Sequence, residues 1–129
     1  MPLRFWREQG CAVVSFEGTY EPQAGLGAIE EALDAEPEPA LGLLLDLTDS
    51  ESFRGRSTDG LRVVAQFLST RRDRFGSRLA TVGGSDLAYG LLRMGTVFAA
   101  DKGIESAVFR TRAEALAWLQ PRGGNQPPA

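Results

Sequence analysis

The chain has 129 residues, of which 43% are hydrophobic and 24% are charged, and its 14 Lys and Arg against 17 Asp and Glu give a net charge of −3. This length favours one domain with a single core, which we expect to span residues 1–119. The chain contains no His and one Cys, which excludes His-dependent catalytic triads, His-bearing metal sites and internal disulfides, so we expect no metal and no cofactor. The charged N-terminus and the lack of a long apolar run predict a cytoplasmic protein without stable membrane insertion.

The charges are distributed unevenly along the chain. Residues 8–53 hold eleven acidic side chains and no basic one, whereas residues 54–78 hold seven arginines and two aspartates. Two interpretations stay open: solvated faces that pair across the fold, or an Arg-rich segment that recruits an anion or orients a partner. A nucleic-acid partner is disfavoured, because the net charge is negative and no aromatic residues alternate with the bases.

The first elements form a strand pair and a helix. A β-branched and aromatic run predicts a strand over residues 11–16, which can pair with residues 3–7 as a hairpin around residues 9–10. A helix of about three turns begins at Pro22 and cannot continue past Pro37, since proline fits only the first helical turn.

The second strand–helix pair follows. A nearly continuous apolar run over residues 41–47 predicts an interior strand with Asp46 at its C-terminal end. A polar loop over residues 48–56 and a helix over residues 57–72 come next. The apolar residues expected on the inner face of that helix are Leu61, Val64, Ala65 and Leu68.

The third pair is a strand over residues 78–82 and a helix that Ser85 or Asp86 caps and that ends near Lys102. Helical spacing predicts a core stripe made of Leu87, Leu91, Met94 and Phe98. The opposite side of the helix gathers Tyr89, Leu92 and Thr96, and such a second apolar face requires another partner.

The last pair is an alternating strand over residues 104–109 and a short helix that ends near Leu119. Thr111 and Glu114 form a capping box at the start of this helix. We expect residues 120–129 to be a disordered tail.

This order of elements predicts an α/β fold with a small, mostly parallel sheet of about five strands, one antiparallel edge strand and about four helices. Successive right-handed βα units wound in one direction place every helix on one face of the sheet. The other face is then thinly covered and available to a ligand or partner.

Functional side chains are expected in the loops after the strands, and the first such region joins Asp46 to the second long helix. Ser57 or Thr58 caps that helix or, alternatively, accepts a phosphate, which would face the positive helix end beside Arg54 and Arg56. Catalysis is disfavoured because no His or Lys is close enough in sequence to activate a hydroxyl.

The second region begins at Ser85, where a glycine turn runs into a helix. The turn either caps the helix or binds an anion through backbone N–H groups. Further along, Tyr89 and Arg93 are four residues apart, so they can pair with each other or converge on a ligand beside Leu92. A third interpretation is a helix face that packs on a neighbouring helix or on a second copy of the chain.

Several stretches between Val13 and Leu119 resemble the SpoIIAA-like branch of the STAS domains. They are Asp46-Leu47-Thr48, Arg56-Ser57-Thr58-Asp59, Arg74-Phe75-Gly76, Tyr89-Gly90-Leu91-Leu92-Arg93-Met94, Val108-Phe109-Arg110 and Ala115-Leu116-Ala117-Trp118-Leu119. The resemblance implies a small sheet with βα units wound in one direction, and a non-enzymatic regulatory module.

The resemblance also implies two functions. STAS relatives that antagonise anti-sigma factors are phosphorylated at the start of the second helix, where this chain carries Ser57 and Thr58, although Arg56 replaces the acidic residue of the pattern. We therefore expect a module that binds a protein partner or a second copy of itself, as a homodimer. The alternative is a carrier or sensor that holds a small apolar or anionic, lipid-like ligand between helices, with an arginine on its head group.

Overall fold

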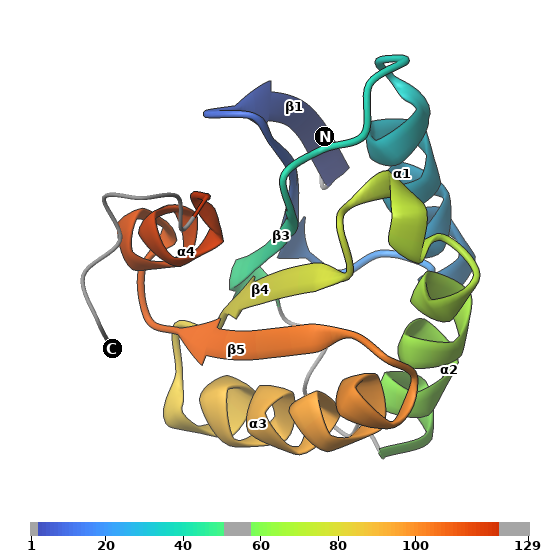
Figure 1. Cartoon of the computed structure of the whole chain (residues 1–129). Helices are drawn as coiled ribbons and strands as arrows, with labels where there is room; N and C mark the ends of the chain where they lie inside the picture. Colours follow the sequence, from blue (N-terminus) through green and yellow to red (C-terminus); the bar gives the residue numbers. More distant parts are fainter. Residues whose placement is uncertain (1–2, 51–57, 122–129) are drawn as a thin grey trace.

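The computed structural model describes residues 3–50 and 58–121 (Figure 1). Its elements are β1 (Leu3–Glu8), β2 (Cys11–Gly18), α1 (Pro22–Asp34), β3 (Leu43–Ser50), α2 (Thr58–Ser69), a 3₁₀ turn (Arg72–Arg74), β4 (Arg78–Val82), α3 (Asp86–Asp101), β5 (Glu105–Phe109) and α4 (Arg112–Leu119). Among these described helices, none has the length and apolar content that a membrane span needs.

The five strands form one sheet in the order β1-β2-β3-β4-β5. β1 pairs antiparallel with β2, and the other neighbouring strands pair in parallel, which confirms the predicted sheet. The hairpin between β1 and β2 turns at Gln9 and Gly10, both with positive φ (52° and 82°). Two successive residues of positive φ match the twist of an antiparallel pair, so this turn fixes the register of β1.

β3 extends further than its apolar run predicts, because it continues to Ser50. Asp46 therefore lies within the strand rather than at its end. Residues 48–50, which we expected in a loop, follow β2 beyond a register shift between Ser15 and Glu17. A polar stretch resembles a loop in sequence, but after this register shift its backbone continues to pair with β2.

The helices occupy both faces of the sheet, which corrects the prediction of a single covered face. α1, α2 and α3 lie on one side of the sheet and α4 on the other (Figure 1). The crossover rule places the three helices that connect parallel strands. α4 follows the last strand and connects it to no further one, so the rule does not constrain α4.

The α4 face is a packed core of its own. Leu116 and Leu119 of α4 are 5% and 1% exposed, and they pack over Val13, Leu44 and Val82 of the sheet. Burial of this apolar area holds the helix on the strands. The face that we expected to be free for a ligand is therefore closed over β2 to β4.

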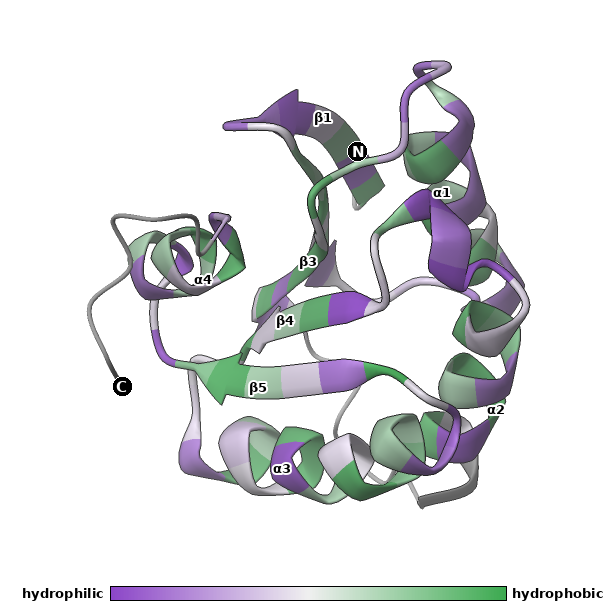
Figure 2. Ribbon diagram, viewed as in Figure 1, coloured by the Kyte–Doolittle hydropathy of each residue, from purple (hydrophilic) through white to green (hydrophobic). Residues whose placement is uncertain are grey.

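α3 turns a different side to the sheet than its large apolar residues predict. Its buried residues are Ala88, Leu92 and Ala99, whereas Leu87 is 57% and Met94 46% exposed. Small residues let the helix backbone approach the neighbouring strand closely. The core side of α3 therefore carries alanines, whose hydrophobic pattern is weak in the sequence. Figure 2 shows apolar residues along most of α3, which explains the ambiguity.

The Arg-rich segment meets the acidic one across the fold. The Arg74 guanidinium donates to the carbonyl oxygens of Leu33 (3.0 Å), Glu36 (2.8 Å) and Pro37 (3.2 Å), at the C-terminal end of α1. The Leu33 carbonyl lies in the last turn of α1, where carbonyls lack helical partners and carry the negative end of the helix dipole, which a cation stabilises. Arg71 adds an ion pair of 3.4 Å with Glu30.

Candidate functional site

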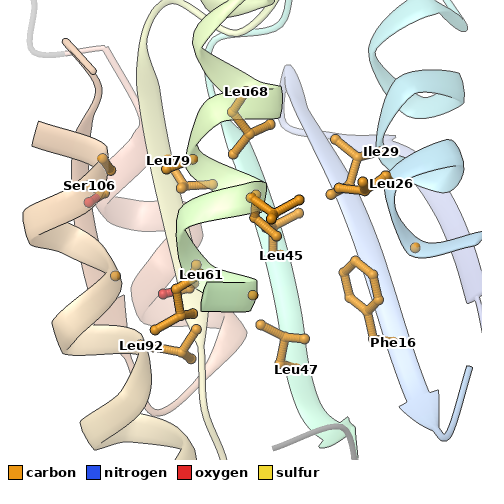
Figure 3. A pocket seen from close by; sticks show the side chains of 18 of the residues that line it. Phe16, Leu26, Ile29, Leu45, Leu47, Leu61, Leu68, Leu79, Leu92 and Ser106 are labelled. Atoms are coloured by element: carbon orange, nitrogen blue, oxygen red, sulfur yellow. The ribbon is translucent and has the colours of Figure 1, made fainter. Parts of the chain in front are cut away.

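An apolar cavity of about 330 Å³ lies between the sheet and the three helices on its first face. Alternate residues of a strand point to the same face, so four strands each supply part of one wall. Figure 3 labels lining side chains from these strands and from α1, α2 and α3: Phe16, Leu26, Ile29, Leu45, Leu47, Leu61, Leu68, Leu79, Leu92 and Ser106. Val63 of α2 also lines the cavity and is 55% exposed, so the cavity reaches the surface there.

The position of α2 creates the cavity. α2 packs mainly against α3, and no strand is among its main neighbours within the described chain. Leu68 near its C-terminal end is fully buried, and Ala65 is 6% exposed, whereas Leu61 nearer the N-terminal end is only half-buried. The N-terminal half of α2 therefore stands away from the strands.

Small residues keep the space open from the helical side. The glycines and alanines in the lining are Gly25, Gly60, Ala65, Gly95 and Ala99. At Gly95, where an added Cβ would meet only the Leu61 Cδ2 at 3.6 Å, a larger apolar side chain would gain free energy by filling the cavity. The small size of these residues leaves room for a molecule of another kind.

The lining is uncharged among the described residues, and it contains four side-chain hydroxyls, those of Tyr20, Thr81, Thr96 and Ser106. Two of these have partners: Tyr20 shares a hydrogen bond of 3.1 Å with Ser50, and Thr96 donates to the Arg93 carbonyl oxygen at 2.6 Å. Apolar walls with a few polar groups are typical of small-molecule sites.

Leu92 is the predicted site residue that the structure places in the cavity, where it is 7% exposed. Tyr89 and Arg93, which could pair or converge on a ligand according to the sequence, contact different groups in the structure. The Arg110 guanidinium carbon lies 4.3 Å from the centre of the Tyr89 ring, and Arg110 also pairs with Asp86 at 2.9 Å. Arg93 is exposed, and its side chain makes no ion pair with any described residue.

Asp46 lies on the opposite face of the sheet from the cavity, with Leu44 and α4. Its Oδ2 accepts from Arg112 Nη2 (2.9 Å) and Nε (3.1 Å), and its Oδ1 accepts from the Thr48 hydroxyl (2.6 Å) and Thr48 N–H (3.1 Å). Burial raises the pKa of Asp46, but these hydrogen bonds and the Arg112 charge outweigh burial and hold that pKa below its usual value. Both carboxylate oxygens are occupied, so Asp46 anchors α4 to β3 and does not join the cavity.

Ser85 caps α3, as the sequence predicts. Its Oγ accepts a hydrogen bond of 3.1 Å from the Ala88 N–H. The anion-binding alternative finds no support among the described side chains near this turn, because Asp86 lies in the first turn of the helix.

Replacement of the cap gives a first prediction. Ser85→Ala should lower the free energy of unfolding by about 1 kcal/mol, because one N–H at the helix start loses its acceptor. Urea denaturation measures this change. Ser69→Ala is the control, since the exposed Ser69 hydroxyl donates back to the Gln66 carbonyl of its own helix, and this change should cost much less. Equal effects of the two substitutions would contradict the capping role.

Arg56 and Ser57 lie outside the described residues. Thr58 begins α2, but its side chain is outside the described part as well. The phosphorylation hypothesis on Ser57 and Thr58 therefore stays a prediction from sequence.

Three residues that matter were missed in the sequence. Thr81 and Ser106 are small polar residues at inward positions of β4 and β5. For Thr81 the available signal was a hydroxyl between the apolar Ala80 and Val82, whereas Ser106 follows the charged Glu105. Arg112 gave a weaker signal, because its partner Asp46 is distant in sequence. Within the described residues, no three His, Cys, Asp or Glu side chains gather where they could hold a metal ion.

Among known proteins, similarity is found to solved structures, whereas neither of the two sequence comparisons gives a match. No family model matches the chain, and no curated protein matches it. A crystal structure from Shewanella loihica PV-4 is similar with a TM-score of 0.59 and 20% sequence identity, and the match covers 92% of each chain. That protein is described as an uncharacterized protein from the DUF3478 family with a SpoIIAA-like fold. The likeness shows that this chain has a SpoIIAA-like fold, which confirms the fold that we predicted.

Proposed function

We propose that this SpoIIAA-like domain is a non-enzymatic binding module that holds a small apolar molecule between its sheet and its helices. The observation that carries the proposal is the cavity of about 330 Å³, whose described lining residues are uncharged and include small residues on all three helices. Burial of apolar surface is the main source of affinity at such a site. The sequence left this function as the alternative to protein binding, and the geometry favours it.

Binding of an uncharged fluorescent dye tests this function. 1-Naphthylamine, a neutral dye of about a dozen non-hydrogen atoms whose emission shifts to the blue in apolar surroundings, should bind the full chain saturably with one site per chain. Native mass spectrometry of freshly purified protein should also show a population with added mass from a small molecule. Unsaturable dye emission, together with a single unmodified mass, would overturn the proposal.

Protein–protein interaction is a second proposal, which exposed apolar residues on the outer side of α3 support. Leu87, Met94 and Val97 are 57%, 46% and 66% exposed. Self-association through this surface would bury them. Sedimentation of the full chain over a range of concentrations should then show a dimer that Val97→Glu dissociates. A monomer at every concentration would contradict self-association.

A further inference from the structure

Two hydroxyls on one wall of the cavity lack hydrogen-bond partners. The Ser106 Oγ is buried and has no partner, and Thr81, which is 7% exposed, makes no side-chain hydrogen bond with the described residues. Both residues line the cavity from β4 and β5. A hydroxyl as buried as the Ser106 Oγ is normally satisfied in folded proteins, so its missing partner requires an explanation.

The sheet register places both hydroxyls on the same wall. Leu79 lies opposite Ser106 and Thr81 lies opposite Val108, and residues two apart on a strand share a face. The two hydroxyls are therefore diagonal neighbours within a surface that is otherwise apolar. A ligand oxygen that reaches this wall would supply the hydrogen-bond partner that the Ser106 and Thr81 hydroxyls lack.

The size and charge of the cavity limit the ligand further. A cavity of roughly 150 Å³ is enough for benzene, so the 330 Å³ here enclose about a dozen non-hydrogen atoms. No described lining residue is charged, and a carboxylate or phosphate buried without a cation loses its hydration with no compensation. The arginine that we expected to hold an anionic head group is absent from the described lining.

We infer that the ligand is a neutral, apolar molecule of about a dozen non-hydrogen atoms that carries one hydroxyl or carbonyl oxygen, and that this oxygen binds at Ser106 and Thr81. The inference rests on the proposed function, because it names the class of molecule that the same cavity takes. The apolar part of the ligand lies among the leucines of the lining, and its oxygen forms a hydrogen bond with the hydroxyl of Ser106 or Thr81.

Three compounds with one ring system separate the two proposals. The full chain is titrated at pH 7 with naphthalene, 2-naphthol and 2-naphthoate, which differ in having no oxygen, a neutral hydroxyl and a carboxylate. We expect 2-naphthol to bind at least about tenfold more tightly than 2-naphthoate and several-fold more tightly than naphthalene, as one neutral hydrogen bond allows. If 2-naphthoate binds as tightly as 2-naphthol, the inference is overturned while the proposed function stands. If none of the three binds, both are overturned.

Two variants test whether the ligand oxygen binds at Ser106 and Thr81. Ser106→Ala and Thr81→Val should each lower the affinity for 2-naphthol by about 2- to 10-fold and leave the affinity for naphthalene unchanged. Neither change should lower the midpoint of thermal unfolding, because each removes a hydroxyl that has no partner in the free protein. An equal loss for both compounds, or no loss for 2-naphthol in either variant, would contradict the assignment.

Discussion

Gly95→Leu is expected to weaken ligand binding by about 100-fold and to make the protein more stable. A Cβ added at Gly95 would meet only the Leu61 Cδ2, at 3.6 Å, which is an ordinary contact. The rest of the leucine side chain would enter the cavity and displace about four ligand carbons. At about 0.8 kcal/mol for each buried carbon, the dye should lose about 100-fold in affinity. Dye titration and urea denaturation measure the two effects.

The gain in stability has two sources. Leucine is favoured over glycine inside a helix by about 0.5–1 kcal/mol, and its side chain would bury apolar surface that the cavity now leaves without contacts. We expect the free energy of unfolding to rise by about 1–2 kcal/mol, a range between the gain from helix propensity alone and the gain with full burial.

Gly90→Leu is the matched control in the same helix. Gly90 is exposed, and a Cβ there would have no neighbour within 4 Å. The substitution should give the helix-propensity gain of about 0.5–1 kcal/mol and leave dye affinity within a factor of two. If Gly95→Leu binds the dye as well as Gly90→Leu does, the dye does not occupy this cavity.

Local signals were strong where the sequence predicted the fold correctly. Pro22 stands at the start of α1, the Thr111 hydroxyl accepts from the Glu114 N–H at 3.2 Å, and the apolar runs before the turns became β2 and β4. These features depend on neighbours in sequence, through backbone geometry and capping. They determined the order of the elements and hence the mostly parallel sheet.

The candidate site was less predictable because it depends on contacts between distant segments. The cavity exists where Gly25, Gly60 and Gly95 of three helices meet one sheet face, and no local pattern brings them together. α3 shows the same difficulty, since the alanines of its buried side carry less hydrophobic signal than the exposed Leu87 and Met94. Asp46 was predicted from sequence as a binding residue at a strand end, but in the structure it lies within β3 and its partner is an arginine 66 residues away in sequence.

Arg112→Leu should lower the free energy of unfolding at pH 7 by about 2 kcal/mol. The substitution leaves the Asp46 carboxylate, whose side chain is 8% exposed, without its cation. Loss of one partner from a fully buried ion pair costs about 3–5 kcal/mol. We expect less here because the Arg112 side chain is 41% exposed and Thr48 still donates two hydrogen bonds to Asp46. The Arg112 guanidinium carbon also lies 5.2 Å from the centre of the Trp6 ring, so the substitution removes this contact as well.

The pH dependence of this effect distinguishes the ion pair from simple loss of packing. Because the folded state holds the pKa of Asp46 below its usual value, the pair stabilises the protein above about pH 4, the usual pKa of aspartate in an unfolded chain, and the contribution disappears as the pH falls through the lower, folded pKa. The difference between the wild type and Arg112→Leu in urea denaturation should therefore stay constant from pH 7 to about pH 5 and shrink as the pH falls below about 4. Arg110→Leu is the control, since the side chain of its partner Asp86 is 97% exposed, and an exposed pair should contribute less than about 1 kcal/mol at any pH. A difference for Arg112→Leu that does not change with pH would mean that the arginine acts through packing on Trp6 and that Asp46 needs no cation.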